Sequence, residues 1–285
     1  MSATTGDALA QPVQHRSSRL FWSAAAILLA WVLVAVFAPL LMPHDPTDFV
    51  SDDSFAPPGR IAWLGTDYLG RDLLSRLIGG AQLTLAMAFA ATLLAHLLGG
   101  TLGLLAAIRG GIFDAALSRA VDVVLSLPKI IVGLVVVAAV GTSVAVLVVI
   151  AGLVYAAGVF RIARALGADV AVMDFVRAAQ ARGEGALWLL FGEILPNVVM
   201  PLAADFAIRM SFAILFMSSL SFIGLGVQPP RADWGGLVRE NLSGLSAGSW
   251  APLVPALAIA SVAIALNLLV DAIGDRRQAV RARDE

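Results

Sequence analysis

Long stretches without Asp, Glu, Lys or Arg dominate this sequence of 285 residues. A helix needs about 20 apolar residues to cross the roughly 30 Å hydrocarbon core of a bilayer. Four stretches of about this length or longer contain no charged residue: 20–42, 77–108, 130–160 and 251–270. A fifth stretch, 198–226, contains only two charged residues, Asp205 and Arg209. Charged residues make up only 14% of the chain, against about 25% in a typical soluble domain. The sequence therefore predicts an all-α, polytopic membrane protein.

A turn signal divides one of these stretches. Val140 to Ser143 reads Val-Gly-Thr-Ser, which is typical of a turn and not of a helix interior. We therefore expect one helix from about Ala115 to Val140 and a second from Val144 to Phe160. Residues 20–42 are too long for a signal-peptide core and are followed by no small-x-small cleavage site, so they predict a retained first span. The total is six transmembrane helices.

The distribution of arginine indicates the orientation. Most arginines lie near the two ends of the chain, between residues 109 and 119, and between residues 161 and 197. Short cytoplasmic loops carry the excess of Lys and Arg, so both termini and the 161–197 loop are predicted to be cytoplasmic. The predicted segments are an N-terminal tail (1–19), a first span (20–42), an external loop (43–80), a core of five helices (81–275) that includes the loop 161–197, and a C-terminal tail (276–285).

Several chemistries are disfavoured by what the chain lacks. It has no cysteine, and its three histidines are too far apart in sequence for metal-ligand spacing, so no metal site is expected. The single lysine, Lys129, follows Pro128, which leaves no phosphate-binding loop of the G-x-x-x-x-G-K-[ST] type. A formal net charge of -1 disfavours nucleic-acid binding. We predict no catalytic residue and no cofactor bound by this chain.

The 161–197 loop contains more structure than a connector needs. Asp174 is a good helix N-cap and Gly183 suits a helix C-terminus, so residues 174–183 predict a short helix with small residues at Ala178 and Ala179. Nine residues, 184–192, separate Gly183 from the sequence Glu193-Ile-Leu-Pro196. From the residues alone, this segment is either a docking helix for another protein or an amphipathic helix on the membrane surface.

Two other segments combine glycine with polar residues. The first runs from Trp63 to Arg76 and contains Gly65, Thr66, Asp67, Gly70, Arg71 and Asp72. Its glycines permit tight turns, and its acids and arginines are spaced to form ion pairs within the loop. The second runs from Ser219 to Pro230 and contains Ser221, Gly224 and Gly226, followed by Asp233-Trp-Gly-Gly236. It predicts either unwound backbone lining a cavity or a simple helix exit.

Few polar residues lie inside the predicted spans. Asp205 and Arg209 are one helical turn apart and predict either a polar wall of a translocation path or a pair that neutralises itself against a neighbouring helix. His96 and Asn267 are explained by hydrogen bonds between helices. Gly99 and Gly103 form a G-x-x-x-G pattern, which predicts close helix packing.

Together these motifs resemble the permease subunits of ABC importers, in the dipeptide/oligopeptide/nickel branch. Arg177-Ala-Ala-x-x-x-Gly183 with Glu193-Ile-Leu-Pro196 is similar to the cytoplasmic EAA loop, and the segments at 63–76 and 219–236 resemble two further signatures of the branch. Two positions depart from the EAA pattern, because Arg177 replaces its leading Glu and Glu193 stands at its Ile position. The resemblance implies ATPase-coupling residues at these positions: Arg177, Ala178, Ala179, Gly183, Glu193, Leu195 and Pro196.

The resemblance also implies partners and a substrate. The partners would be a homologous second permease, two ATP-binding subunits that hold ATP and Mg²⁺, an external solute-binding protein and membrane lipid. The substrate would be dipeptides or oligopeptides carried across the cytoplasmic membrane, with nickel or glutathione transport as alternatives within the branch. Path residues would include Asp205, Arg209, Ser221, Gly224 and Gly226. An ion-coupled secondary transporter is the rival, but it predicts charged residues on several helices and an internal repeat, neither of which is evident.

Overall fold

The computed structural model describes residues 11–284, with side chains described for residues 20–274. Every regular element in that part of the chain is helical, and β-type pairing there is limited to two isolated bridges, Phe49 with Arg71 and Thr66 with Asp72. The elements are α1 (Gln11–Val36), α2 (Ala38–Leu41), α3 (Leu73–Ala95), the π-helical turn η1 (His96–Gly100), α4 (Thr101–Arg109), α5 (Gly111–Ser126), α6 (Lys129–Val140), α7 (Val144–Ala171), α8 (Asp174–Ala181), α9 (Ala186–Trp188), the π-helical turn η2 (Leu189–Ile194), α10 (Leu195–Ile223), α11 (Trp234–Glu240), the 3₁₀ turn η3 (Leu242–Leu245) and α12 (Leu253–Asp284).

The membrane-length helices confirm an all-helical membrane protein. Four helical stretches are long and apolar enough to cross a bilayer: Leu73–Arg109, Val144–Ala171, Ala186–Ile223 and Leu253–Gly274. The bent pair α5 and α6 makes a fifth candidate span, and Leu20–Val36 is a shorter apolar helix.

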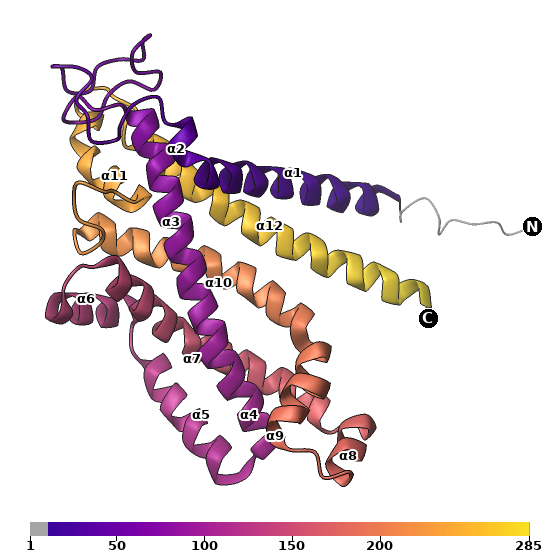
Figure 1. Cartoon of the computed structure of the whole chain (residues 1–285). Helices are drawn as coiled ribbons and strands as arrows, with labels where there is room; N and C mark the ends of the chain where they lie inside the picture. Colours follow the sequence, from indigo (N-terminus) through magenta and orange to yellow (C-terminus); the bar gives the residue numbers. More distant parts are fainter. Residues whose placement is uncertain (1–10, 285) are drawn as a thin grey trace, which may run out of the picture.

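The core lies where α3, α7 and α10 pack against one another. Figure 1 shows α1 and α12 side by side, and α1 also contacts α3 while α12 contacts α10. Gly99 and Gly103 face α7 so closely that a Cβ would lie 2.2 Å from the Ala156 carbonyl oxygen and 2.6 Å from that of Phe160. The close packing predicted from the G-x-x-x-G pattern is therefore confirmed.

The two ends of the bundle differ. The loop between α2 and α3 lies with α11 at one end, whereas α4 and the α8–α9 region lie at the other (Figure 1). The start of α1 and the end of α12 are both directed away from the α2–α3 loop (Figure 1). The predicted external signature loop and the predicted cytoplasmic loop are thus well separated in the molecule.

The expected continuous helix from Ala115 to Val140 is wrong. The structure breaks it into α5 and α6, which meet at an angle of 86°. Pro128 lacks an N–H and disfavours helical backbone at the preceding residue, and Leu127 accordingly is extended, with φ of -88° and ψ of 136°. The predicted turn is confirmed, because Gly141 has a φ of +104° and Ser143 caps α7.

Other helix ends differ from the predicted boundaries. The helix expected from about residue 81 begins at Leu73, eight residues earlier, and α7 continues past Phe160 to Ala171, so that the predicted loop 161–197 is helical for much of its length. The first predicted span (20–42) is interrupted at Phe37, just before Pro39. The predicted tail from residue 276 continues the backbone of α12 to Asp284. Residues 11–19 of the predicted N-terminal tail form the start of α1, and residues 1–10 lie outside the described residues.

Candidate functional site

Asp67 is the centre of a buried ion cluster beneath the α2–α3 loop. Its carboxylate accepts a hydrogen bond of 2.7 Å from Nε of Arg71 and another from Arg76. Glu240 at the end of α11 accepts from the same two arginines, at 3.3 Å and 2.8 Å. The pairing of Asp67 with Arg71 was predicted from sequence; the cluster also ties the loop to α3 and α11.

Two glycines shape the backbone around this cluster. Gly65 and Gly70 each have a φ of +79°, and a Cβ at these positions would lie 2.4 Å from the Ala56 carbonyl oxygen and 2.1 Å from that of Ser51. Thr66 accepts a hydrogen bond of 2.8 Å from the Ala56 N–H. The predicted tight turns are therefore present, and they are also close approaches of backbone to backbone.

Asp72 does not join the ion cluster but caps α3. Its Oδ2 accepts hydrogen bonds from the Ser75 N–H at 3.0 Å and from the Ser75 hydroxyl at 2.5 Å. The Ser75 hydroxyl in turn accepts a hydrogen bond of 3.0 Å from the His44 N–H. An aspartate cap satisfies helix N–H groups that have no partner within the helix, which explains why α3 begins at Leu73.

The Trp-Gly-Gly segment forms α11, which packs on α3. Trp234 is fully buried, and its indole Nε1 donates a hydrogen bond of 3.0 Å to the Leu77 carbonyl. Asp233 caps α11 through the N–H groups of Gly235 and Gly236, both at 3.3 Å. Burial raises the pKa of the Asp233 carboxyl to about 6.

The predicted path residues Ser221, Gly224 and Gly226 lie where α10 ends. Gly224 has a φ of +98° and terminates the helix, and the chain is non-helical from there to α11. A Cβ at Gly226 would lie 1.7 Å from the Ser221 Oγ, and one at Gly224 would lie 2.9 Å from Cζ of Arg239. In this single chain the three residues are closely packed against one another and against α11.

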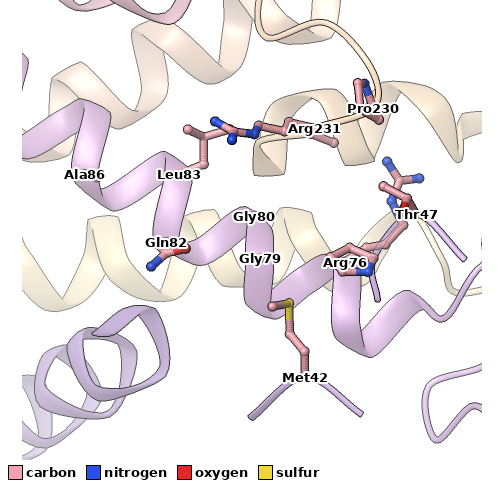
Figure 2. A pocket seen from close by; sticks show the side chains of 12 residues that line it. Met42, Thr47, Arg76, Gly79, Gly80, Gln82, Leu83, Ala86, Pro230 and Arg231 are labelled. Atoms are coloured by element: carbon pink, nitrogen blue, oxygen red, sulfur yellow. The ribbon is translucent and has the colours of Figure 1, made fainter. Parts of the chain in front are cut away.

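A cavity of about 520 Å³ opens beside α3 at the same end of the molecule. Figure 2 shows Arg231 extended toward Leu83, with Arg76 and Thr47 at the other side of the hollow. Nη2 of Arg76 is buried without a hydrogen-bond partner. The polar side chains around this cavity are therefore two arginines, Arg76 and Arg231, with Thr47 and Gln82.

The predicted coupling segment folds as the short helix α8 at the opposite end. Ala179 is fully buried together with Val176 against the chain's own core, whereas Arg177, Ala178 and Gly183 are exposed. Gly183 follows the helix with a φ of +84° and has open space around it. The expected C-terminal glycine is confirmed, but the side chain of Asp174 makes no capping hydrogen bond and Met173 holds the N-cap position.

The second half of the motif joins α8 to α10. Glu193 lies in the π-helical turn η2, and its Oε1 is 3.9 Å from Nη2 of Arg182. Pro196 follows directly after η2, inside the continuous helical stretch Ala186–Ile223. Leu195 is partly buried and contributes to the apolar cluster that holds Ala179. These residues fix α8 to the N-terminal start of α10.

Asp205 and Arg209 form an ion pair inside the bundle. Nε of Arg209 donates a hydrogen bond of 2.7 Å to Asp205 Oδ2, and Nε2 of His96 lies 3.3 Å from the same oxygen. The guanidinium of Arg209 rests on Gly158, where a Cβ would be 2.6 Å from Nη1. His96 therefore contacts α10, in line with the contact between helices expected from the sequence, but the sequence did not indicate that its partner is the Asp205–Arg209 pair. Asn267 donates to the Ser211 hydroxyl at 3.2 Å, which confirms the expected bond between helices.

Comparison with known proteins identifies the family. Residues 99–278 match the model of the inner membrane component of binding-protein-dependent transport systems, and residues 14–58 match the N-terminal transmembrane domain of oligopeptide transport permease C. The chain belongs to this family of transport permeases. The first match contains α8 and the Asp205–Arg209 pair, whereas the signature loop at 63–76 falls between the two matched ranges.

Relatives of this permease match it over most of their length. It is 33% identical over 254 residues to the dipeptide transport system permease protein DppC of Haemophilus influenzae, covering 87% of this chain and 86% of the relative. It is 34% identical to the di/tripeptide permease protein DppC of Pseudomonas aeruginosa, covering 87% and 84%. It is 32% identical to the glutathione permease protein GsiD of Pectobacterium atrosepticum, covering 89% and 84%.

Two residues in and beside the ion cluster around Asp67 were not predicted. Glu240 neutralises both arginines, and Asn241 accepts a hydrogen bond of 3.1 Å from the Tyr68 N–H. Both are more than 150 positions from their partners in the chain. In the sequence, the only feature that marks Glu240 and Asn241 is their position at the end of the short helix that begins with Trp-Gly-Gly.

Proposed function

We propose that this permease crosses the cytoplasmic membrane six times, with both termini and α8 on the cytoplasmic side, and lines half of the path for an imported solute. The bent pair α5–α6 would be one span and the first apolar helix another, in addition to the four long helical stretches. A homologous second permease would complete the path, and an external solute-binding protein would deliver solute to the end that carries the α2–α3 loop and the cavity of Figure 2.

The exposed side of α8 is the observation that carries the proposal. A helix of eight residues is held to the bundle by buried Val176 and Ala179 and presents Arg177, Ala178 and the open surface at Gly183. We infer that this surface docks on one of two ATP-binding subunits, which hold ATP and Mg²⁺. Because α8 is fixed to α10 through η2, movement of a docked subunit would bias the bundle between two states. This chain itself performs no covalent chemistry.

The proposed substrates are dipeptides or short oligopeptides. The relatives named for dipeptide and di/tripeptide transport support this class. A glutathione permease at similar identity supports glutathione as the second candidate, and nickel remains the third within the branch. Among the described residues there is no group of three or more His, Asp or Glu side chains that could hold a metal ion.

The test of coupling uses a charge placed on α8. Ala178→Asp adds a carboxylate to the exposed side without touching the buried residues, so the subunit should reach the membrane and assemble while ATP-driven dipeptide uptake by the reconstituted complex falls. Gln180→Asp is the matched control, because it adds the same charge on the same helix closer to the buried side. Equal uptake by the two variants and the wild type would reject docking at Ala178.

The test of topology uses the absence of cysteine from the chain. Single cysteines introduced at Ser51, Ser246 and Gln180 should react with a membrane-impermeant thiol reagent from opposite sides: the first two from outside and the third from inside. Labelling of all three from one side would overturn the six-span arrangement. Uptake by the purified chain alone, driven by an ion gradient, would instead support a secondary transporter.

A further inference from the structure

Lys129 is the only lysine in the chain, and it lies at the sharp break between α5 and α6. Its side chain is exposed, and the ammonium lies 4.8 Å from the ring centroid of Tyr155 on α7. Among the described residues, no carboxylate lies within 4.0 Å of this ammonium. Asp205 and Arg209 in α10, by contrast, form an ion pair with each other.

An open cavity of about 460 Å³ lies beside this lysine, which forms part of its wall. Its walls come from α6, α7 and α10, and the polar groups on them include Lys129, Tyr155 and Ser219, with Phe212 and Phe216 as apolar wall. The Tyr155 hydroxyl donates a hydrogen bond of 2.9 Å to the Phe212 carbonyl, which fixes the ring beneath the ammonium. The cavity is therefore held in shape by contacts between two long helices.

The cavity lies on the side of α10 that no further helix covers. α12 and α3 pack on α10, and α1 packs on α12 and α3, whereas only α6 and α7 approach the cavity. An ammonium in a membrane span is costly unless it meets an anion or water, and such residues mark solute pathways.

We propose that Lys129 and the cavity beside it form a subsite on the translocation path that receives the carboxylate of the solute. A peptide with a free C-terminus carries that group, and a lysine ammonium forms a charge-assisted hydrogen bond with it. The ring of Tyr155 holds the ammonium in place by a cation–π contact, and Phe212 and Phe216 offer apolar surface to a peptide side chain. This inference rests on the proposed peptide transport.

The experiment replaces the ammonium and then restores it. In the full complex with the second permease, both ATP-binding subunits and the binding protein, Lys129→Cys should lower dipeptide uptake by about tenfold or more, because a hydrogen bond to a charged group contributes roughly that factor to binding. Treatment with an aminoethyl methanethiosulfonate places an ammonium on the introduced thiol and should restore most of the uptake. A sulfonatoethyl reagent of similar size places a negative charge there and should not.

Two controls separate charge from structure. Ile131→Cys introduces a thiol at another exposed position of α6 that is not among the cavity residues above, and neither reagent should change its uptake. The amount of assembled complex recovered for Lys129→Cys should equal that of the wild type, since the proposal gives Lys129 no partner in another subunit.

Each other result overturns the inference. Unchanged uptake by Lys129→Cys, or restoration by the anionic reagent, would show that the charge is not required. Loss of complex assembly would show that Lys129 instead pairs with an acid of a partner subunit. If the wild-type complex moves no dipeptide in the same assay, the proposed function fails. If the wild type and Lys129→Cys are both fully active, only the Lys129 subsite fails.

Discussion

Trp234 and Leu77 are joined by a hydrogen bond of 3.0 Å from the indole Nε1 to the main-chain carbonyl, which fastens α11 to α3. The Trp234 ring is fully buried. Its Cδ1 would lie 3.1 Å from a Cβ placed on Gly80. The ring also packs edge-on against Trp31, with the ring centroids 4.8 Å apart. One side chain therefore connects α1, α3 and α11 at the end of the bundle that carries the α2–α3 loop.

Removing this anchor should destabilise the permease in two steps. Trp234→Phe retains an aromatic ring but loses the donor, which costs about 1 kcal/mol. Trp234→Ala also leaves a cavity and should cost about 3–5 kcal/mol. Thermal unfolding of the purified chain in detergent measures both. Trp63→Phe is the control, because that side chain is 67% exposed; an equal shift for Trp63→Phe and Trp234→Phe would refute the anchoring role.

The buried ion cluster predicts an asymmetry between its two acids. Asp67 is fully buried between Arg71 and Arg76, so Asp67→Asn leaves two buried cations without their central partner and should cost about 3–5 kcal/mol. Glu240 is 14% exposed, so Glu240→Gln should cost less. Limited proteolysis of the α2–α3 loop in intact membranes reports the loss of order. Asp53→Asn, at an exposed position in the same loop, should behave like the wild type.

The sequence predicted local features better than the partners of distant residues. The turn at Gly141, the glycine after α8 and the Gly99–Gly103 contact depend on backbone conformations or spacings that neighbouring residues determine. The Glu240 partner of Arg76 depends on how α11 packs on α3, and nothing near either residue specifies that packing. Pro128 is an intermediate case, because a proline that can break a helix is present in the sequence but the helix predicted from Ala115 to Val140 takes no account of it.

The raised pKa of Asp233 leads us to expect that the stability of the folded permease depends on pH. Burial raises its pKa from 3.8 to about 6, so the folded state binds a proton more readily than the unfolded state. This contribution to stability is complete below about pH 4 and is lost as the pH rises through about 6, amounting to no more than about 3 kcal/mol. Asp233→Asn retains an oxygen that can cap α11 and should remove this dependence. The difference in unfolding temperature between variant and wild type, followed from acidic to neutral pH, measures the effect; a constant difference would contradict it.

Asp205 and Arg209 allow the two interpretations of the charged pair to be separated. Either single change, Asp205→Asn or Arg209→Gln, leaves a buried charge without its partner and should cost about 3–5 kcal/mol, whereas the double change removes both charges and should recover most of that stability. If the pair only neutralises itself against α7 and His96, dipeptide uptake recovers with stability in the double variant. If the pair contacts solute, stability recovers and uptake does not. We expect recovery of both, because Asp205 is buried, its carboxylate accepts from Arg209 at 2.7 Å, and the guanidinium rests on Gly158.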